Sequence, residues 1–531
     1  MRTETTSVLV LGGGLVGLSA AVFLAWRGVP TVLVEKHAGS SPHPRAVGYT
    51  SRTMELYRSV GLADQIPEAP KGAGLRRVRA ESLAGAWFEE QHWTPVEQAP
   101  VTIEYSPTGS AGLAQDKLEP LLRAHAVKLG ADVRFSTELR SADQDAHGIR
   151  ATLADGTEIR ADYLIAADGH RSPVREQLGI GRTGRGHLST GRSVIFRAPL
   201  EEYLASGVRQ FAIEQPGFSA FLTTYGDGRW VLFHDDELDD TSPAALRALI
   251  DKATGRTDLD VEIVVTGRWV TNALVADAYA DGRIFLAGDA AHALPPNRGA
   301  YSANTGIEDA HNLAWKLAAV VGGESDPALL NSYEAERRPI ALLCHDQIFA
   351  RLDNDADVII DDQAMAHGYL YRSAVLPDAT ADLPPAQRPE AWAGQPGTRG
   401  RHLWLTRSGA RLSTLDITQR GWTLLGEAGL WRDAVRRAPI PVDYQQIGVD
   451  YKTDVEEFRA AFGITETGAT LIRPDGYIAW RCEKAPDEPF SALARALNVA
   501  ADPGIRSGET ATDGSFSAPT DHGDNIGVSS E

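Results

Sequence analysis

Residues 7–35 read SVLVLGGGLVGLSAAVFLAWRGVPTVLVE, and this stretch decides the fold of the N-terminal part of the chain. It predicts a buried strand, a helix and a second strand at residues 7–11, 18–27 and 31–34. A GxGxxG motif occupies residues 12–17, and the second strand ends at Glu35. This order of strand, glycine-rich turn, helix, strand and acid predicts a dinucleotide-binding unit.

Each glycine of the motif has its own task. Gly12 allows a tight turn, Gly14 lets the backbone approach a pyrophosphate, and Gly17 lets the helix pack closely on the strand. Free amides at the helix start face the anion, and Glu35 can accept the ribose hydroxyls of an adenosine. Residues 7–25 carry no charge, which also suggests a secretory signal. That signal would need a basic start and a cleavage site rather than three glycines, so we expect a cofactor site.

The bulk composition bounds the size and the class of the protein. The 531 residues exceed what one core accommodates, so two or three domains are expected. The 71 acidic and 52 basic residues give a net charge of −19, which disfavours nucleic acid and membranes as partners. Cys344 and Cys482 cannot form a disulfide framework, and no Cys/His cluster indicates a metal site. Without a further apolar run of membrane-spanning length, we expect a cytoplasmic protein.

Changes in sequence texture divide the chain. A β-rich stretch with a hairpin at residues 218–233 interrupts the nucleotide-binding texture, which resumes at residue 282. Helices are expected at residues 53–60, 118–129, 305–320, 331–352 and 454–462, and a further helix with Ser242 as its N-cap is expected within the β-rich stretch. The predicted nucleotide-binding domain is discontinuous and comprises residues 1–75, 100–180 and 270–373, and the β-rich domain comprises residues 76–99 and 181–269. A linker at 374–400, a separate α/β domain at 401–501 and a disordered tail at 502–531 are expected to follow.

A second motif, ADGHRSPVR at residues 167–175, follows a buried strand. It places Asp168 at the end of the strand. The guanidinium groups of Arg171 and Arg175 suit a phosphate or a ribose edge. Taken alone, the motif is equally typical of an ordinary strand that ends in a turn.

A third motif, GDAAH at residues 288–292, also ends a strand. The carboxylate of Asp289 can bond a polyol hydroxyl of a bound cofactor. The helix expected from Thr305 directs its positive end toward whatever precedes it, which suits an anionic ring. The joint occurrence of three such motifs favours a cofactor site over three unrelated turns.

In this order, the motifs resemble the single-component FAD-dependent aromatic hydroxylases, the family of p-hydroxybenzoate hydroxylase and phenol hydroxylase. Residues 454–481 are similar to the thioredoxin-like C-terminal domain of phenol hydroxylase and of polyketide hydroxylases such as aklavinone 11-hydroxylase. The resemblance spans about residues 8–500. It implies an α/β protein with a Rossmann-like FAD-binding domain of the GR2 type, an inserted β-rich substrate domain and a thioredoxin-like C-terminal domain.

The resemblance also implies a set of FAD-binding residues. Arg45 matches a loop arginine near the FAD phosphates, and Gln115 matches a flavin-contacting glutamine. The motif with Asp168, Arg171 and Arg175 serves FAD and, transiently, NADPH. The implied set comprises Gly12, Gly14, Leu15, Val16, Gly17, Glu35, Lys36, Arg45, Gln115, Asp168, Gly288, Asp289, Pro296, Gly299 and Asn304.

The implied reaction is an NADPH- and O2-dependent monooxygenation through a flavin hydroperoxide. We interpret the substrate as a polycyclic aromatic polyketide or a related phenol, which is hydroxylated. Baeyer–Villiger insertion or an oxidative ring rearrangement of the same substrates is the alternative. A non-catalytic nucleotide-binding scaffold is the third interpretation.

Two side chains are candidates for acting on the substrate. Arg372 lies in a Tyr-Leu-Tyr-Arg-Ser segment that resembles a stretch of polyketide hydroxylases, and its charge can favour a phenolate. A structural salt bridge is its other interpretation. Tyr225 can hydrogen-bond the substrate or serve as an ordinary sheet tyrosine. His43 and His292 lie near the flavin motifs, where lone histidines are more often structural.

The sequence departs from the family pattern at two places. Residues 297–303 stand where the family has a glycine-rich turn, and they carry more bulk. The C-terminal domain has no CxxC motif, so we expect it to have a structural role without disulfide chemistry.

Overall fold

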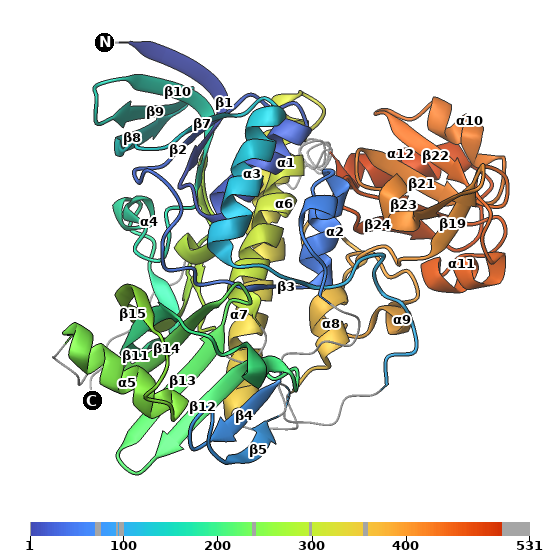
Figure 1. Ribbon diagram of the computed structural model, residues 1–531. Helices are drawn as coiled ribbons and strands as arrows, with labels where there is room; N and C mark the ends of the chain where they lie inside the picture. Colours follow the sequence, from blue (N-terminus) through green and yellow to red (C-terminus); the bar gives the residue numbers. More distant parts are fainter. Residues whose placement is uncertain are drawn as a thin grey trace, which may run out of the picture.

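The computed structural model describes residues 2–69, 76–91, 94, 100–235, 241–296, 300–353 and 359–501. Its first sheet has the order β16-β17-β10-β1-β2-β7 and is extended by β9 and β8. β1 pairs in parallel with β10 and β2, and α1, α3 and α6 lie side by side along this sheet (Figure 1). The strands are β1 Thr3–Leu11, β2 Thr31–Val34, β7 Asp132–Arg134, β8 Leu139–Asp145, β9 Gly148–Leu153, β10 Glu158–Ala166, β16 Ala280–Asp281 and β17 Ile284–Leu286.

The helices of this part follow the sequence pattern closely. They are α1 Leu15–Trp26, α2 Ser51–Ser59, α3 Gln115–Lys128, α4 Pro173–Gln177, α6 Tyr301–Val321, α7 Asn331–Asp353 and α8 Asp362–His367, with short 3-10 turns at Ala63–Gln65, Gly288–Ala290 and Pro327–Leu330. α1 is buried along almost its whole length, because its residues are apolar or small on every side. Three expected starts are corrected, since α1, α3 and α6 begin at Leu15, Gln115 and Tyr301, ahead of the predicted residues 18, 118 and 305.

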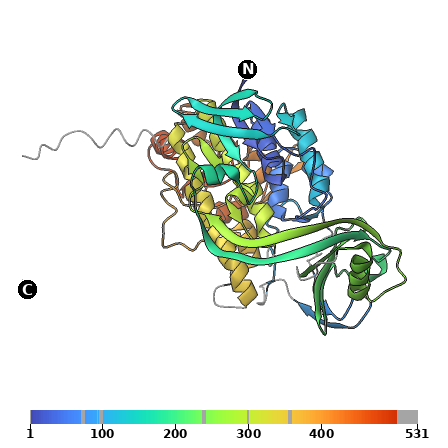
Figure 2. The same cartoon turned by 90° about the vertical axis from the view of Figure 1, so that its left-hand side faces the viewer.

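The second sheet forms an outer lobe in the order β18-β15-β11-β14-β13-β12-β4-β5. β11 and β15 are long paired strands that run from the first sheet's region into this lobe (Figure 2). The elements are β4 Arg77–Ala80, β5 Trp87–Gln91, β11 Arg182–Arg197, β12 Gln210–Gln215, β13 Phe218–Thr224, β14 Arg229–Asp235, α5 Pro243–Thr254, β15 Glu262–Ala276 and β18 His292–Ala293, with a 3-10 turn at Glu201–Leu204. The β13–β14 hairpin is confirmed, as is the Ser242 cap of α5, which accepts from the Ala245 amide.

The C-terminal unit contains a third sheet in the order β22-β21-β23-β24. β21 pairs in parallel with β22 and antiparallel with β23, which pairs antiparallel with β24. The elements are α9 Pro389–Trp392, β19 Trp404–Arg407, β20 Ala410–Ser413, β21 Trp422–Gly426, α10 Trp431–Arg436, β22 Val442–Gln446, α11 Val455–Phe462, β23 Ala469–Ile472, β24 Ile478–Cys482 and α12 Pro489–Ala500, with a 3-10 turn at Thr414–Ile417. A small pair, β3 Gly48–Tyr49 and β6 Ala111–Gly112, completes the strands of the described residues.

Packing joins the C-terminal unit to the first sheet. One apolar core runs from β1 and α1 through α6 and α7 to Trp422, Leu424 and Trp431 of the C-terminal unit. The proline-rich segment expected to be a linker is packed as well. Its Gly397 accepts from the Tyr371 amide at 2.8 Å and donates to Ile478 O at 2.8 Å. The C-terminal unit is therefore fixed to the body of the protein.

The segment 502–531, expected to be a disordered tail, lies outside the described residues. Along the described part of the chain, no helix combines the length and apolar character needed to cross a bilayer.

Candidate FAD site

The glycine turn after β1 is as tight as the motif predicts. Gly12 has φ +107°, and a Cβ there would lie 2.3 Å from Ala167 O. A Cβ on Gly17 would lie 1.9 Å from Gly12 O. At both positions the backbone leaves no room for a side chain, because turn, helix and neighbouring strand are in direct contact.

Gly14, at the start of α1, differs from these two glycines. A Cβ on Gly14 would meet only Glu119 Oε1, at 3.8 Å. No side chain caps this helix start, and its first turn has no acidic residue. Leu15 and Gly17 are buried and Gly14 and Val16 are partly exposed, and the first amides of α1 have no acceptor within the helix. A pyrophosphate fits this position by charge and by space.

Glu35 closes the turn from the end of β2. Its Oε2 accepts from the Gly13 amide at 2.7 Å, and its Oε1 accepts from the His37 amide at 2.8 Å. Glu35 Oε1 also lies 2.6 Å from His37 Nδ1, and the side chain is 14% exposed, so the carboxylate keeps a small exposed edge beside the helix start. Lys36 is exposed next to it.

Residues from distant parts of the chain meet around the loop that carries Arg45. Gln115 Oε1 accepts from the Arg45 amide at 3.2 Å, and Arg45 Nη1 lies 3.3 Å from Asp289 Oδ2. Asn304 Oδ1 accepts from the Thr50 amide at 3.1 Å. The structure thus brings together four of the predicted FAD-binding residues.

Val16 has a packing role that the sequence did not indicate. A Cβ on Gly288, which has φ +60°, would lie 2.6 Å from Val16 Cγ2. A Cβ on Gly306 would lie 2.7 Å from the same methyl group and 2.9 Å from Gly288 Cα. These three residues let α1 and α6 approach the turn that presents Asp289.

The Asp168 motif divides into two kinds of residue. Asp168 Oδ1 is buried without a hydrogen-bond partner, and burial raises the pKa of this carboxyl. An unpartnered acceptor at this edge suits a ligand hydroxyl. Arg171 is exposed, whereas buried Arg175 donates to His170 O at 3.2 Å and Ala290 O at 3.1 Å. The expected phosphate role does not fit Arg175, because its guanidinium serves the protein's own backbone.

The remaining predicted residues lie at the edges of the site. Pro296 is exposed, and Gly299 lies outside the described residues. His292 Nε2 is 2.8 Å from Asp309 Oδ2 in the buried interior. His43 occupies the space beside Gly267 of β15, where a Cβ would lie 2.6 Å from the His43 Nε2 atom.

The two substrate candidates have protein partners. Tyr225 is 8% exposed and donates to Pro44 O at 2.9 Å, so it holds the Arg45 loop against the second sheet. Arg372 donates to Thr380 O at 3.0 Å and also to Leu383 O. Within the described residues these bonds tie Arg372 to a neighbouring loop. A role at the substrate remains a prediction for both residues.

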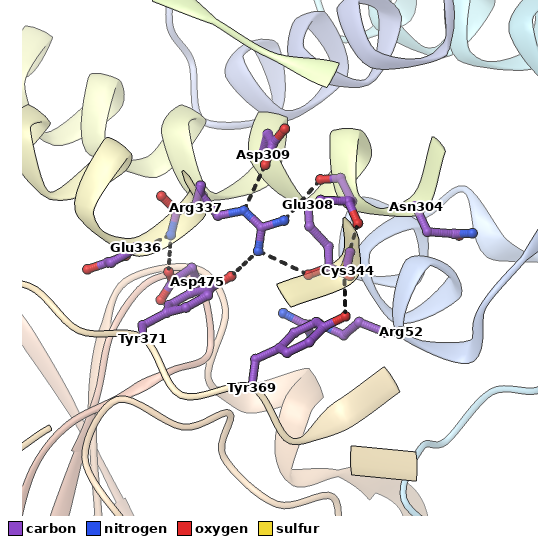
Figure 3. A network of polar contacts seen from close by, with 12 residues as sticks. Arg52, Asn304, Glu308, Asp309, Glu336, Arg337, Cys344, Tyr369, Tyr371 and Asp475 are labelled. Carbon is purple, nitrogen blue, oxygen red and sulfur yellow. Dashed lines mark hydrogen bonds and ion pairs between the residues drawn. The ribbon is translucent and has the colours of Figure 1, made fainter. Parts of the chain in front are cut away.

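The sequence did not predict the grouping of two further sets of residues. Phe221, Phe233 and Trp269 form a partly exposed aromatic row on the second sheet; period-two alternation was their only signal. Arg337 and Asp309 pair inside the protein at 2.8 Å (Figure 3). Both residues lie in expected helices, at residues 305–320 and 331–352, but nothing in the sequence marked them as partners.

A dinucleotide cradle built from three chain segments and joined to a separate β lobe defines a flavoprotein oxidoreductase. Residues 5–347 match the family model described as FAD binding domain, and residues 393–503 match aromatic-ring hydroxylase, C-terminal. The chain is 38% identical to tetracenomycin A2 monooxygenase-dioxygenase of Streptomyces glaucescens, over 94% of this chain and 97% of that protein. It is 40% identical to 4-methyl-5-nitrocatechol 5-monooxygenase of a Burkholderia species, over 93% and 97%.

A solved structure shows the same architecture. Aklavinone-11 hydroxylase in complex with FAD and aklavinone superposes with a TM-score of 0.84 at 35% identity, over 94% of this chain and 100% of that one. The protein therefore belongs to the FAD-dependent aromatic-ring hydroxylases and is a monooxygenase. This result excludes the scaffold interpretation.

Proposed function

We propose that this protein hydroxylates a polycyclic aromatic phenol of the polyketide type, with NADPH and O2 as co-substrates. The names of its relatives support the substrate class, because tetracenomycin A2 and aklavinone are the compounds that those proteins act on or bind. Reduced by NADPH, FAD supplies the oxygen-activating chemistry. The protein has to bind and orient the substrate and to exclude water.

The aromatic row on the second sheet is the observation that carries the proposal. The Phe233 and Trp269 rings are 4.4 Å apart, and the Phe221 and Phe233 rings are 6.0 Å apart. Gly267 and Trp269 are two residues apart on β15 and therefore lie on the same face of the sheet, the face that His43 touches. The row therefore begins beside the Arg45 loop. Flat, partly exposed rings are suited to stacking against a planar polycyclic substrate.

The position of the aromatic row supports separate roles for the parts of the chain. We assign residues 76–99 and 181–269 to substrate binding and the first sheet with its helices to FAD. We further assign the C-terminal unit to the thioredoxin-like fold, which its strand order and flanking helices α10, α11 and α12 support. Without a CxxC motif, this unit is structural.

Substitution of Trp269 tests the stacking role. Trp269→Leu should weaken binding of an anthracycline-like phenol by about two- to tenfold, the range expected for one lost aromatic contact. It should leave binding of small monocyclic phenols nearly unchanged. Substrate-dependent acceleration of flavin reduction, followed by stopped-flow absorbance, gives both affinities. Trp87→Leu on β5 of the same sheet is the matched control. Equal loss for large and small phenols would refute the stacking role.

Product analysis tests the reaction itself. Mass spectrometry and NMR should show one added oxygen on an intact ring skeleton. A ring-expanded or ring-contracted product would replace hydroxylation by Baeyer–Villiger insertion or rearrangement.

A further inference from the structure

The turn between β23 and β24 inserts charged side chains into the interior of the FAD-binding part. Arg473 makes a bidentate ion pair with Glu336 of α7, at 2.7 and 2.9 Å. Asp475 accepts from Trp315 Nε1 of α6 at 3.0 Å. All four side chains are buried. The C-terminal unit therefore contacts both helices that support the candidate FAD site.

A chain of contacts leads from this turn to the Gly288–Asp289 turn. The rings of Tyr477 and Tyr371 stack at 4.0 Å with 11° between their planes. Tyr371 OH accepts from Arg337 Nη1 at 2.7 Å, and Arg337 Nε donates to Asp309 Oδ1 at 2.8 Å (Figure 3). Asp309 Oδ2 accepts from the Gly288 amide at 3.2 Å. We call Tyr371, Arg337 and Asp309 the relay.

The relay is held in one arrangement by burial and charge. Arg337 and Asp309 are both 0% exposed. Burial alone raises the pKa of Asp309, but Arg337 and His292 bring it below its ordinary value, so the carboxylate stays charged. A buried ion pair that loses one partner leaves the other uncompensated, so this network resists rearrangement. Ser302 Oγ, one turn before Gly306 on α6, donates to Asp289 Oδ1 at 3.1 Å, which links the same helix to the cofactor turn.

The relay reaches the candidate FAD cradle through the backbone amide of Gly288 and not through a side chain. Asp309 binds the amide of Gly288, whereas the side chain of the next residue, Asp289, meets Arg45. A shift of Asp309 would therefore move the backbone that presents Asp289 without removing any FAD-binding side chain. Residues that orient ligand-binding groups in this way affect ligand affinity indirectly, without contacting the ligand.

We propose that the relay consists of positioning residues through which the C-terminal unit sets the Gly288–Asp289 turn and thereby the affinity and reduction potential of FAD. The C-terminal unit is then an internal support of the flavin site. This role is independent of the substrate assigned above.

Tyr371→Phe tests the proposal, because it removes the hydroxyl that binds Arg337 and keeps the ring on Tyr477. FAD titration of the apoprotein by flavin fluorescence should show a dissociation constant raised about three- to tenfold. This is less than the full effect of a lost hydrogen bond to a charged group, because Asp309, Glu308 and the Thr305 carbonyl still hold Arg337. The flavin reduction potential of the holoprotein should also shift. Tyr444→Phe is the matched control, since it removes a hydroxyl bonded to Ala428 O at 2.7 Å inside the C-terminal unit.

Thermal unfolding of both apoproteins separates positioning from general damage. The proposal requires that Tyr371→Phe change FAD affinity and potential while Tyr444→Phe changes neither, even where both substitutions lower the melting temperature. A second variant, Tyr477→Leu, removes the stacking partner in the C-terminal unit and should raise the FAD dissociation constant in the same direction. Wild-type affinity and potential in both Tyr371→Phe and Tyr477→Leu would overturn the proposal.

Discussion

At the scale of single residues, the three motif glycines differ in what surrounds them. Gly12 and Gly17 face backbone atoms at distances no side chain tolerates, whereas Gly14 faces space at the start of α1. Gly14 also has an ordinary φ of −81°, so an alanine there is not strained. The fold therefore needs Gly12 and Gly17, whereas Gly14 is a glycine that the fold does not require, and we propose that it makes room for the cofactor.

This difference yields a paired prediction. Gly14→Ala should leave the unfolding free energy of the apoprotein nearly unchanged and weaken FAD binding roughly tenfold or more, about 1.4 kcal/mol. Gly17→Ala should destabilise the apoprotein by about 1–3 kcal/mol, because its Cβ overlaps Gly12 O. Urea unfolding and FAD titration measure the two effects. If Gly14→Ala binds FAD as tightly as the wild type, the pyrophosphate does not bind at the start of α1.

At the scale of elements, α6 shows how tertiary contacts extend a helix. The sequence predicted a start near Thr305, yet the helix begins at Tyr301 after Ala300, which has φ +55° and provides no cap. Asn304 is fixed by two hydrogen bonds. Its Oδ1 accepts from the Thr50 amide at 3.1 Å and from Thr53 Oγ1 at 2.6 Å. These contacts with α2 stabilise a first turn that has no local signal. The close approach of α1 to α6 depends in the same way on Gly306.

The contact between α1 and α6 leads to a prediction about the stability of the apoprotein. Gly306→Ala gains helix propensity of about 1 kcal/mol, but its Cβ would lie 2.7 Å from Val16 Cγ2. Overpacking of about 1–3 kcal/mol should outweigh the gain, so the apoprotein loses stability. Val16→Ala removes the methyl group, and the double variant should lose less than the sum of both single variants. Strict additivity in urea unfolding would show that the two side chains do not meet.

At the scale of the whole molecule, the sequence predicted what local signals encode. The glycine turn, the β13–β14 hairpin and the Ser242 cap depend on neighbouring residues, and all are found. Contacts between distant segments carry no such signal. Arg473 and Glu336 are 137 positions apart, and their pairing is decided by how the C-terminal unit docks. The family resemblance predicted the FAD-binding and C-terminal parts that the family models match, whereas the buried charges that join them required the structure.

A second buried junction between distant segments makes stability depend on pH. His367 of α8 lies beside Glu55 of α2 and Arg399 of the C-terminal segment, and its Nε2 is 2.9 Å from Ser51 Oγ. Burial, reinforced by Arg399, lowers the pKa of His367 to about 3. Between its ordinary pKa of 6.5 and 3, the unfolded chain binds a proton at this residue and the folded chain does not. The unfolding free energy should therefore fall as the pH falls through this window.

The expected contribution of His367 is about 1.4 kcal/mol per pH unit, or about 2 kcal/mol between pH 6.5 and pH 5. His367→Gln removes the titrating group and retains an amide able to bond Ser51, so its unfolding free energy should fall less on acidification. His147→Gln, at an exposed turn, is the control and should follow the wild type. Denaturant unfolding at pH 7 and pH 5 gives the comparison. If His367→Gln and wild type lose equal stability between these pH values, the junction is not the site at which acid acts.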